Sequence, residues 1–224
     1  MNDLEKIFNN NTGGRISKWI HYFEIYDRYL SQFRHKPVNV LEIGVANGGS
    51  LKMWKKYFGD NAKIYGVDVN KDCKRFEELN VEIFIGSQTD RKFLNKVKDK
   101  IGIIDILIDD GGHTMNQQIT TFEVLFEAIS ENGIYICEDL HTSYWKRFGG
   151  GHKKDDTFIE YSKNFIDSLH GYHSKEVGVS EFTKSVKAIH YYDSIIVIEK
   201  AKRDKPLKKQ VGKKLIQGFK NIVP

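Results

Sequence analysis

The sequence predicts an α/β protein in which a mostly parallel β-sheet carries helices on both faces. From Val38 onward, short β-rich runs alternate with helix-length polar segments, a pattern typical of parallel strands joined by helices. Two later β runs, 186–193 and 194–200, follow each other almost directly, which indicates an antiparallel hairpin at the sheet edge. With 224 residues, 40% of them hydrophobic, the chain is long enough for one sizeable core.

Each expected element follows from its residue pattern. Strands are expected where β-branched and aromatic residues form short apolar runs, and helices where longer polar segments lie between these runs. The expected strands before the hairpin are 38–45, 63–69, 81–86, 104–110 and 133–140, and the expected helices are 50–58, 71–80, 90–100, 115–130 and 157–169. The glycine-rich segment 148–156 is typical of a flexible loop.

The segment before the sheet has aromatic and apolar residues near helical spacing, which predicts an aromatic face. These residues are Trp19, Tyr22, Phe23, Tyr26, Tyr29 and Leu30. Such a face is typical of core packing, and it also suits a lid over a ligand because the segment leads directly into the first strand. We therefore divide the chain into an N-terminal helical lid or cap (1–37), a main domain (38–200) and a basic tail (201–224).

Composition argues against several classes of protein. No apolar stretch reaches the roughly 18 residues of a membrane span, and the first residues lack the basic-then-apolar order of a secretory signal. We therefore expect a cytoplasmic protein. The two cysteines are Cys73 and Cys137, and the apolar run around Cys137 favours reduced, packed thiols over a disulfide or a thiolate metal site.

A glycine-rich turn follows the first strand, in "LEIGVANGGS" (41–50). Gly44, Gly48 and Gly49 would let the backbone approach a ligand closely at the start of the next helix. The spacing matches neither a dinucleotide-binding loop nor a Walker loop, so an ordinary tight turn is an equal alternative.

The acid at the end of the second strand, Asp68, favours the ligand-binding alternative. It follows the glycines by about twenty residues, where an acid accepts both hydroxyls of a ribose. Glu42 precedes the glycines and the loop has no Lys or Arg for a phosphate. The pattern therefore suits a ligand with an amine or a sulfonium, such as S-adenosylmethionine.

Two neighbouring strands of the expected sheet end in pairs of acids. One ends in Asp109 and Asp110 and the other in Glu138 and Asp139. Because parallel strands lie about 4.8 Å apart, these carboxylates can converge on one ion. Three oxygen ligands from Asp110, Glu138 and Asp139 suit Mg²⁺ better than Zn²⁺.

His113, three residues after Asp110, is well placed to act as a general base on a hydroxyl whose pKa the metal lowers. The alternative is a polar turn in which Asp caps the helix that begins near Met115. That alternative leaves the second acidic pair unexplained.

Six segments together resemble the class I S-adenosylmethionine-dependent methyltransferases, and more narrowly the metal-dependent sugar O-methyltransferases of the macrolide (mycinamicin and macrocin) type. They are "LEIGVANGGS", "YGVDVN", "GSQTD", "IDDGGH", "CEDLHTSYW" and "HYYDSIIVIEK". The resemblance runs from about Thr12 to Lys200. It implies a Rossmann-like, doubly wound sheet of seven strands that ends in the hairpin. It also implies an S-adenosylmethionine-dependent and Mg²⁺-dependent O-methyltransferase that acts on a sugar hydroxyl.

The resemblance assigns roles to individual residues. For the cofactor it implies Glu42, Gly44 and Gly48 at the methionine part, Asp68 at the ribose and Ser87 and Gln88 near the adenine, and we add Ser50 and Asp109 to this site. The metal and base roles fall on Asp110, Glu138, Asp139 and His113, as the residues themselves suggest. Two positions depart from the family pattern: Gly112 stands where Ser is frequent, and Ser87 where Asp is common in the third loop.

The expected acceptor site follows the second acidic pair. His141, Tyr144 and Trp145 suit a platform for the apolar side of a sugar ring, although Trp145 suits core packing nearly as well. A nucleotide-linked sugar, a surface-polysaccharide residue and a glycosylated natural product would all offer hydroxyls. The Lys-, Asn- and Ile-rich composition and the basic tail favour a bacterial surface-polysaccharide pathway.

Two other functions stay open. One is a hydroxylase-like or non-catalytic cofactor-binding relative, and the presence of Asp110, His113, Glu138 and Asp139 together argues against a dead enzyme. The other is a catechol-type O-methyltransferase. The histidine after the acidic pair and the contiguous Glu-Asp pair resemble the sugar branch instead.

The net charge of +5 is concentrated in the tail, because segment 201–224 holds eight Lys or Arg residues and one acid. The rest of the chain is slightly acidic and gives no reason to expect a nucleic-acid partner. Four apolar residues of the tail form a stripe beside lysines: Leu215, Ile216, Phe219 and Ile222. This stripe suits either a peripheral contact with the inner membrane or a contact in a homo-oligomer.

Deleting residues 204–224 is expected to reduce binding to anionic vesicles at low salt, where charge screening is weakest. Methyl transfer to a small soluble acceptor should persist. Sedimentation of the full-length and truncated proteins with vesicles measures this difference. Equal pelleting of both proteins, or of neither, would leave the oligomer contact as the role of the tail.

Overall fold

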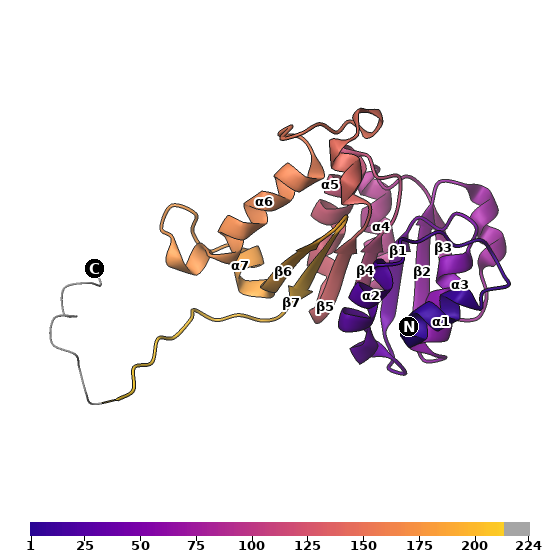
Figure 1. Ribbon diagram of the computed structural model, residues 1–224, viewed down its shortest axis with the longest axis horizontal. Coiled ribbons are helices and arrows are strands. Elements are labelled where there is room, and N and C mark those ends of the chain that lie inside the picture. Colours follow the sequence, from indigo (N-terminus) through magenta and orange to yellow (C-terminus); the bar gives the residue numbers. More distant parts are fainter. Residues whose placement is uncertain (213–224) are drawn as a thin grey trace.

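The computed structural model describes residues 1–212, and its centre is a seven-stranded sheet (Figure 1). The strands are β1 (Asn39–Ile43), β2 (Lys63–Asp68), β3 (Val81–Ile85), β4 (Ile104–Asp109), β5 (Ile129–Cys137), β6 (Val186–Tyr192) and β7 (Ile195–Lys200). Their order is β3-β2-β1-β4-β5-β7-β6. The first five strands run parallel and β7 pairs antiparallel with both β5 and β6. The predicted doubly wound sheet with a terminal hairpin is confirmed.

Helices cover both faces of this sheet because alternate strand residues point to opposite sides. Along β4, Ile106 and Ile108 belong to one apolar cluster and Leu107 to the other. The first cluster lies under α1 (Asp3–Asn9), α2 (Tyr22–Leu30) and α3 (Gly49–Phe58). The second lies under α4 (Arg91–Ile101), α5 (Met115–Leu125), α6 (Phe158–Leu169) and α7 (Glu181–Ser185).

Three expected elements were wrong in type or extent. The expected helix 71–80 is a short 3-10 helix, Lys71–Phe76. The expected helix 115–130 ends at Leu125, and after a 3-10 turn β5 begins at Ile129, which pairs with Ile104. The strand predicted at 133–140 therefore begins four residues before its predicted start, and it ends at Cys137 because the chain turns at Asp139, whose φ is +55°.

The N-terminal region is helical only in part. Helix α1 was not expected; its first turn is capped by the Asn2 side chain, which accepts the Glu5 N–H at 2.9 Å. Between α1 and α2, residues 11–21 contain neither helix nor strand. We call residues 11–21 the N-terminal strap. Because both helices pack into the first core cluster, the two ends of the strap are fixed to the body.

The C-terminal tail leaves the sheet after β7. Residues 201–212 contain no helix or strand; Ala201 and Arg203 still bond to the backbone at the end of α7, and the chain beyond them extends away from the body in Figure 1. The predicted apolar stripe lies outside the described residues, so it stays a prediction. Among residues 1–212, none of the helices combines the length and the apolar character that crossing a membrane would require.

Candidate functional site

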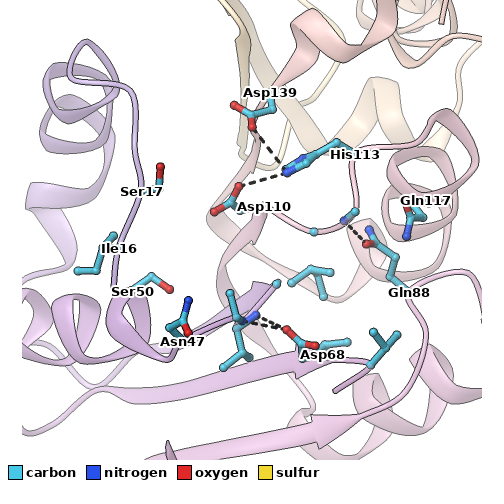
Figure 2. Close-up of a pocket in the computed structure, with 18 of the residues that line it drawn as sticks. Ile16, Ser17, Asn47, Ser50, Asp68, Gln88, Asp110, His113, Gln117 and Asp139 are labelled. Atoms are coloured by element: carbon cyan, nitrogen blue, oxygen red, sulfur yellow. Dashed lines mark hydrogen bonds and ion pairs between the residues drawn. The ribbon is translucent and has the colours of Figure 1, made fainter. Parts of the chain in front are cut away.

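A pocket of about 530 Å³ opens at the carboxyl ends of the parallel strands. It lies beside the β1 and β4 termini, where the strand order reverses and open α/β sheets bind their ligands. Its walls come from the strap, the loop after β1, the ends of β2 and β3, and the loop 110–113 after β4 (Figure 2). The sequence-predicted residues on the wall are Gly44, Ser50, Asp68, Gln88, Asp110, His113 and Asp139.

Gly44 allows two loops to meet at the pocket floor. Its φ of +96° favours glycine, and a Cβ at this position would lie 2.1 Å from the Asp110 carbonyl oxygen. Gly48, with a φ of +69°, precedes the first turn of α3, where a Cβ would strike the Phe76 ring. The glycines therefore bring the backbone after β1 and the start of α3 to the edge of the pocket.

Asp68 ends β2 and faces the pocket from the side opposite the acidic loop. One of its oxygens accepts the N–H groups of Val45 and Ala46, at 3.0 and 2.9 Å, and the other accepts that of Asn70 at 2.8 Å. Burial opposes the charge, yet these three donors hold the pKa of Asp68 below its ordinary value. Asp68 also lines the pocket, so its carboxylate is accessible to a ligand hydroxyl.

Glu42 is fully buried behind the pocket wall. Its two carboxylate oxygens accept the Ser50 hydroxyl at 2.6 Å and the Trp54 indole N–H at 3.0 Å. Burial raises the pKa of Glu42 to about 7. The side chain therefore fixes the first turns of α3 in the present structure, and its contact with a cofactor stays a prediction.

Gln88 supports the loop after β4 from below. Its amide nitrogen donates to Asp109 at 3.2 Å and to Thr121 at 3.1 Å, while its amide oxygen accepts the Gly112 N–H at 2.8 Å. Asp109 is 1% exposed and burial raises its pKa to about 7. Asp109 and Ser87 are not among the pocket-lining residues, so their cofactor roles also stay predictions.

His113 points its Nε2 atom at two carboxylates. The nitrogen lies 3.8 Å from Asp110 Oδ1 and 3.6 Å from Asp139 Oδ2 (Figure 2). His113 and Asp139 both have left-handed backbone conformations, with φ of +57° and +55°. Such conformations cost of order 1 kcal/mol or more for residues other than glycine and cluster at functional sites. The Thr142 hydroxyl lies within hydrogen-bond distance of both carbonyl oxygens, which ties the two turns together.

The side chains at this end of the pocket have atoms that can bind a metal ion. The Asp110, His113 and Asp139 ligand atoms lie within 4.8 Å of one another, and within residues 1–212 these three side chains form the group able to share an ion. Two carboxylate oxygens aimed at one point suit a hard cation such as Mg²⁺. Glu138, the third expected ligand, is 1% exposed and directs both carboxylate oxygens elsewhere.

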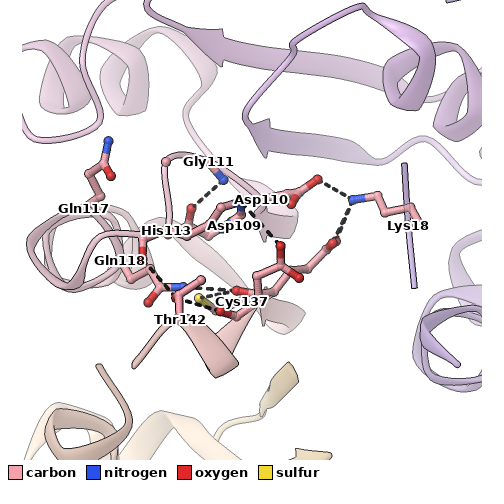
Figure 3. Close-up of polar contacts among 12 residues, drawn as sticks. Lys18, Asp109, Asp110, Gly111, His113, Gln117, Gln118, Cys137 and Thr142 are labelled. Atoms are coloured by element: carbon pink, nitrogen blue, oxygen red, sulfur yellow. Dashed lines mark hydrogen bonds and ion pairs between the residues drawn. The ribbon is translucent and has the colours of Figure 1, made fainter. Parts of the chain in front are cut away.

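The partner of Glu138 is Lys18, a residue that the sequence patterns did not single out. The Lys18 ammonium lies 2.8 and 2.9 Å from the two Glu138 oxygens and 2.6 Å from Asp110 Oδ2 (Figure 3). Tyr26 donates to the same Glu138 carboxylate at 2.5 Å. The one signal in the sequence was the spacing of Lys18, Tyr22 and Tyr26, four residues apart within an aromatic run.

Aromatic rings surround the outer edge of the acidic site. Trp145 is 41% exposed, so core packing does not explain it. The His141 ring lies 4.4 Å from Trp145 and 5.8 Å from Trp19 of the strap. Phe148 continues the series, 6.0 Å from Trp145 and 6.5 Å from His113. Tyr144, 52% exposed, adjoins this edge. Trp19 and Phe148 therefore lie beside the residues expected to form the acceptor platform.

Comparison with known proteins finds several curated relatives, of which two are described, while no protein-family model matches the chain. The chain is 38% identical over 196 residues to 8-demethyl-8-alpha-L-rhamnosyl tetracenomycin-C 2'-O-methyltransferase of Streptomyces olivaceus, covering 82% of this chain and 51% of the relative. It is 36% identical over 199 residues to demethylmacrocin O-methyltransferase of Streptomyces fradiae, covering 82% and 50%. The chain spans about half the length of the curated relatives it matches.

A solved structure is similar over most of the chain. It is the MycE methyltransferase from the mycinamycin biosynthetic pathway, in complex with Mg, SAH and mycinamycin VI. The TM-score is 0.82 and the identity 29%, with 90% of this chain and 54% of that chain covered. The likeness agrees with the strand order and the terminal hairpin described above.

Proposed function

This chain belongs to the class I S-adenosylmethionine-dependent methyltransferases and is related to the macrolide-sugar O-methyltransferases; on that premise we propose that it methylates a sugar hydroxyl. The observation that carries the proposal is the convergence of Asp110, His113 and Asp139 at one end of a pocket whose other end is bordered by Asp68. A cofactor region and a proton-accepting, metal-binding region thus share one cavity.

The cofactor region suits S-adenosylmethionine. Asp68 lines the pocket where it can meet the ribose, and Gly44 leaves the backbone close to the ligand. The start of α3 borders the pocket with Ser50. Mg²⁺ would be held by Asp110 and Asp139, and we keep Glu138 as the third proposed ligand. When bound, the sulfonium supplies the methyl group and the metal lowers the pKa of a coordinated sugar hydroxyl.

The protein's own residues then supply the base and the acceptor site. His113 Nε2 faces the carboxylates that would hold the metal, so it is placed to take the hydroxyl proton. The aromatic rings of Trp19, His141 and Trp145 would pack on the apolar side of the sugar and keep water from the reacting hydroxyl.

Asp68→Ala is expected to weaken the binding of S-adenosylhomocysteine by about 10- to 100-fold, the usual effect of removing a charged acceptor from a buried hydroxyl. Isothermal titration calorimetry measures it. Asp90→Ala is the matched control, because Asp90 caps α4 through the Lys92 and Phe93 N–H groups outside the pocket. Unchanged affinity in Asp68→Ala would remove Asp68 from the cofactor site.

We propose that the acceptor is a cytoplasmic sugar precursor of a surface polysaccharide, either nucleotide-linked or part of a growing glycan, with a glycosylated natural product as the second choice. The composition and the basic tail support the first choice, and the relatives named above support the second. The test is a methyl-transfer screen with labelled S-adenosylmethionine against all three acceptor types, with and without Mg²⁺. Absence of transfer to every sugar would overturn the proposed function.

A further inference from the structure

Lys18 brings a full positive charge into the acidic end of the pocket. Its side chain is 2% exposed, and its ammonium contacts Asp110 and both oxygens of Glu138 within 2.9 Å. Glu42 Oε1 lies 3.9 Å away and the Tyr26 ring centre 5.9 Å away. These neighbours are three acids and one aromatic ring, so the positive charge is held entirely inside the protein.

The electrostatic balance requires this cation. Three carboxylates surround the ammonium, Asp110 and Glu138 within 2.9 Å and Glu42 at 3.9 Å. A buried carboxylate without a partner is strongly unfavourable, so removing the ammonium would leave Glu138 and Asp110 to be compensated by another cation.

Lys18 also fixes the strap over the pocket. Strap residues 15–18 form one wall of the cavity, and Figure 2 shows Ile16 and Ser17 on the side away from His113. At the start of this wall a Cβ on Gly14 would lie 2.1 Å from the Asn47 carbonyl oxygen, so the strap touches the loop after β1. The wall is thus held by close backbone packing at Gly14 and by ion pairs at Lys18.

We propose that Lys18 is a positioning residue: an internal cation that anchors the strap as a wall of the cofactor pocket and shares Asp110 with the metal. The inference rests on the proposed function for the identity of both ligands. Lys18 would connect the two ends of the cavity, because its side chain neutralises the metal-binding acids and holds the strap against the cofactor end. The ammonium contacts Oδ2 of Asp110, whereas Oδ1 faces His113.

The test compares the wild type, Lys18→Met, Glu138→Gln and the double variant Lys18→Met/Glu138→Gln. The double variant removes one buried charge of each sign, so it keeps the test decisive if Lys18→Met alone does not fold. Calorimetric titration with S-adenosylhomocysteine is carried out in EDTA. The affinity of the double variant is expected to be at least about 10-fold lower than that of Glu138→Gln. If the strap is in its closed position in only about a tenth of the molecules, the apparent affinity falls by that same factor. Affinities within twofold would overturn the proposal.

Lys200→Met is the matched control, since Lys200 is also buried but donates to the backbone carbonyls of Phe126, Glu127 and Ile129 at the other side of the sheet. It is expected to lower the melting temperature without changing the affinity for S-adenosylhomocysteine. A merely structural role of Lys18 would make the two lysine variants alike, and that result would also overturn the proposal.

Two further measurements need no cofactor. Trypsin is expected to cleave after Arg15 faster in Lys18→Met than in the wild type, because the wall is released. Mg²⁺ is expected to raise the melting temperature of Lys18→Met more than that of the wild type, because the acids lack their ammonium. If the wild type binds no S-adenosylhomocysteine, the proposed function fails, and these two measurements decide the role of Lys18: unchanged cleavage and an unchanged Mg²⁺ effect would reject it.

Discussion

His113→Ala is expected to lower kcat for sugar methylation by about 10²–10⁴-fold, the usual contribution of a positioned general base. The reason is geometric. Nε2 lies 3.8 Å from Asp110 Oδ1 and 3.6 Å from Asp139 Oδ2, so a hydroxyl bound at these carboxylates would present its proton to this nitrogen. The variant keeps both carboxylates and the cofactor wall, so binding of S-adenosylhomocysteine should change little. Steady-state kinetics and calorimetry measure the two effects separately.

The controls for this prediction are two other histidines. His152, in the exposed loop before α6, is expected to tolerate alanine without loss of activity. His141 Nδ1 is bonded to the Ser194 hydroxyl, and His141 packs beside Trp145, so His141→Ala should act mainly on the KM of the acceptor. A near-normal kcat in His113→Ala, combined with a large loss in His141→Ala, would move the base to His141.

Much of the fold was predictable because its signals are local. The strands after Val38 are short apolar runs and the hairpin has almost no loop, so the class of sheet and its antiparallel end followed from general rules of α/β sheets. The ends of β5 were not predictable in the same way. Ile129 belongs to a strand because it pairs with Ile104, and Asp139 ends the turn in a left-handed conformation that the sequence does not reveal.

The same distinction between local signals and long-range contacts applies to the residues of the candidate site. The acids after β4 and β5 were predictable because parallel strands end at one edge of a sheet. Lys18 was not, because its contacts with Asp110 and Glu138 join residues 92 and 120 positions apart and depend on how the strap crosses the pocket. Gln88 is similar: its amide supports Gly112 and Asp109, a role that only the packed loop shows.

Removal of the metal with EDTA is expected to abolish methyl transfer, and Mg²⁺ is expected to restore it. Asp110→Asn and Asp139→Asn should each lower kcat/KM by about 10³-fold, since a metal supplies several kcal/mol of charge stabilisation. Both variants would lose a hard anionic oxygen facing His113, while Asp68 and the cofactor side of the pocket stay intact. Activity assays with and without Mg²⁺, together with direct titration of Mg²⁺, measure the loss and its cause.

A matched control lies on the same strand as Asp110. Asp105, near the start of β4, accepts the Asn39 N–H at 2.9 Å at the opposite end of the sheet, so Asp105→Asn is expected to affect stability and leave metal dependence unchanged. The acidic variants should bind S-adenosylhomocysteine nearly as the wild type does, because Lys18 keeps Glu138 as a partner and the strap stays in place. Full turnover by the wild type in EDTA would contradict the metal mechanism. His113 would then have to act as the general base on a hydroxyl whose pKa no metal has lowered.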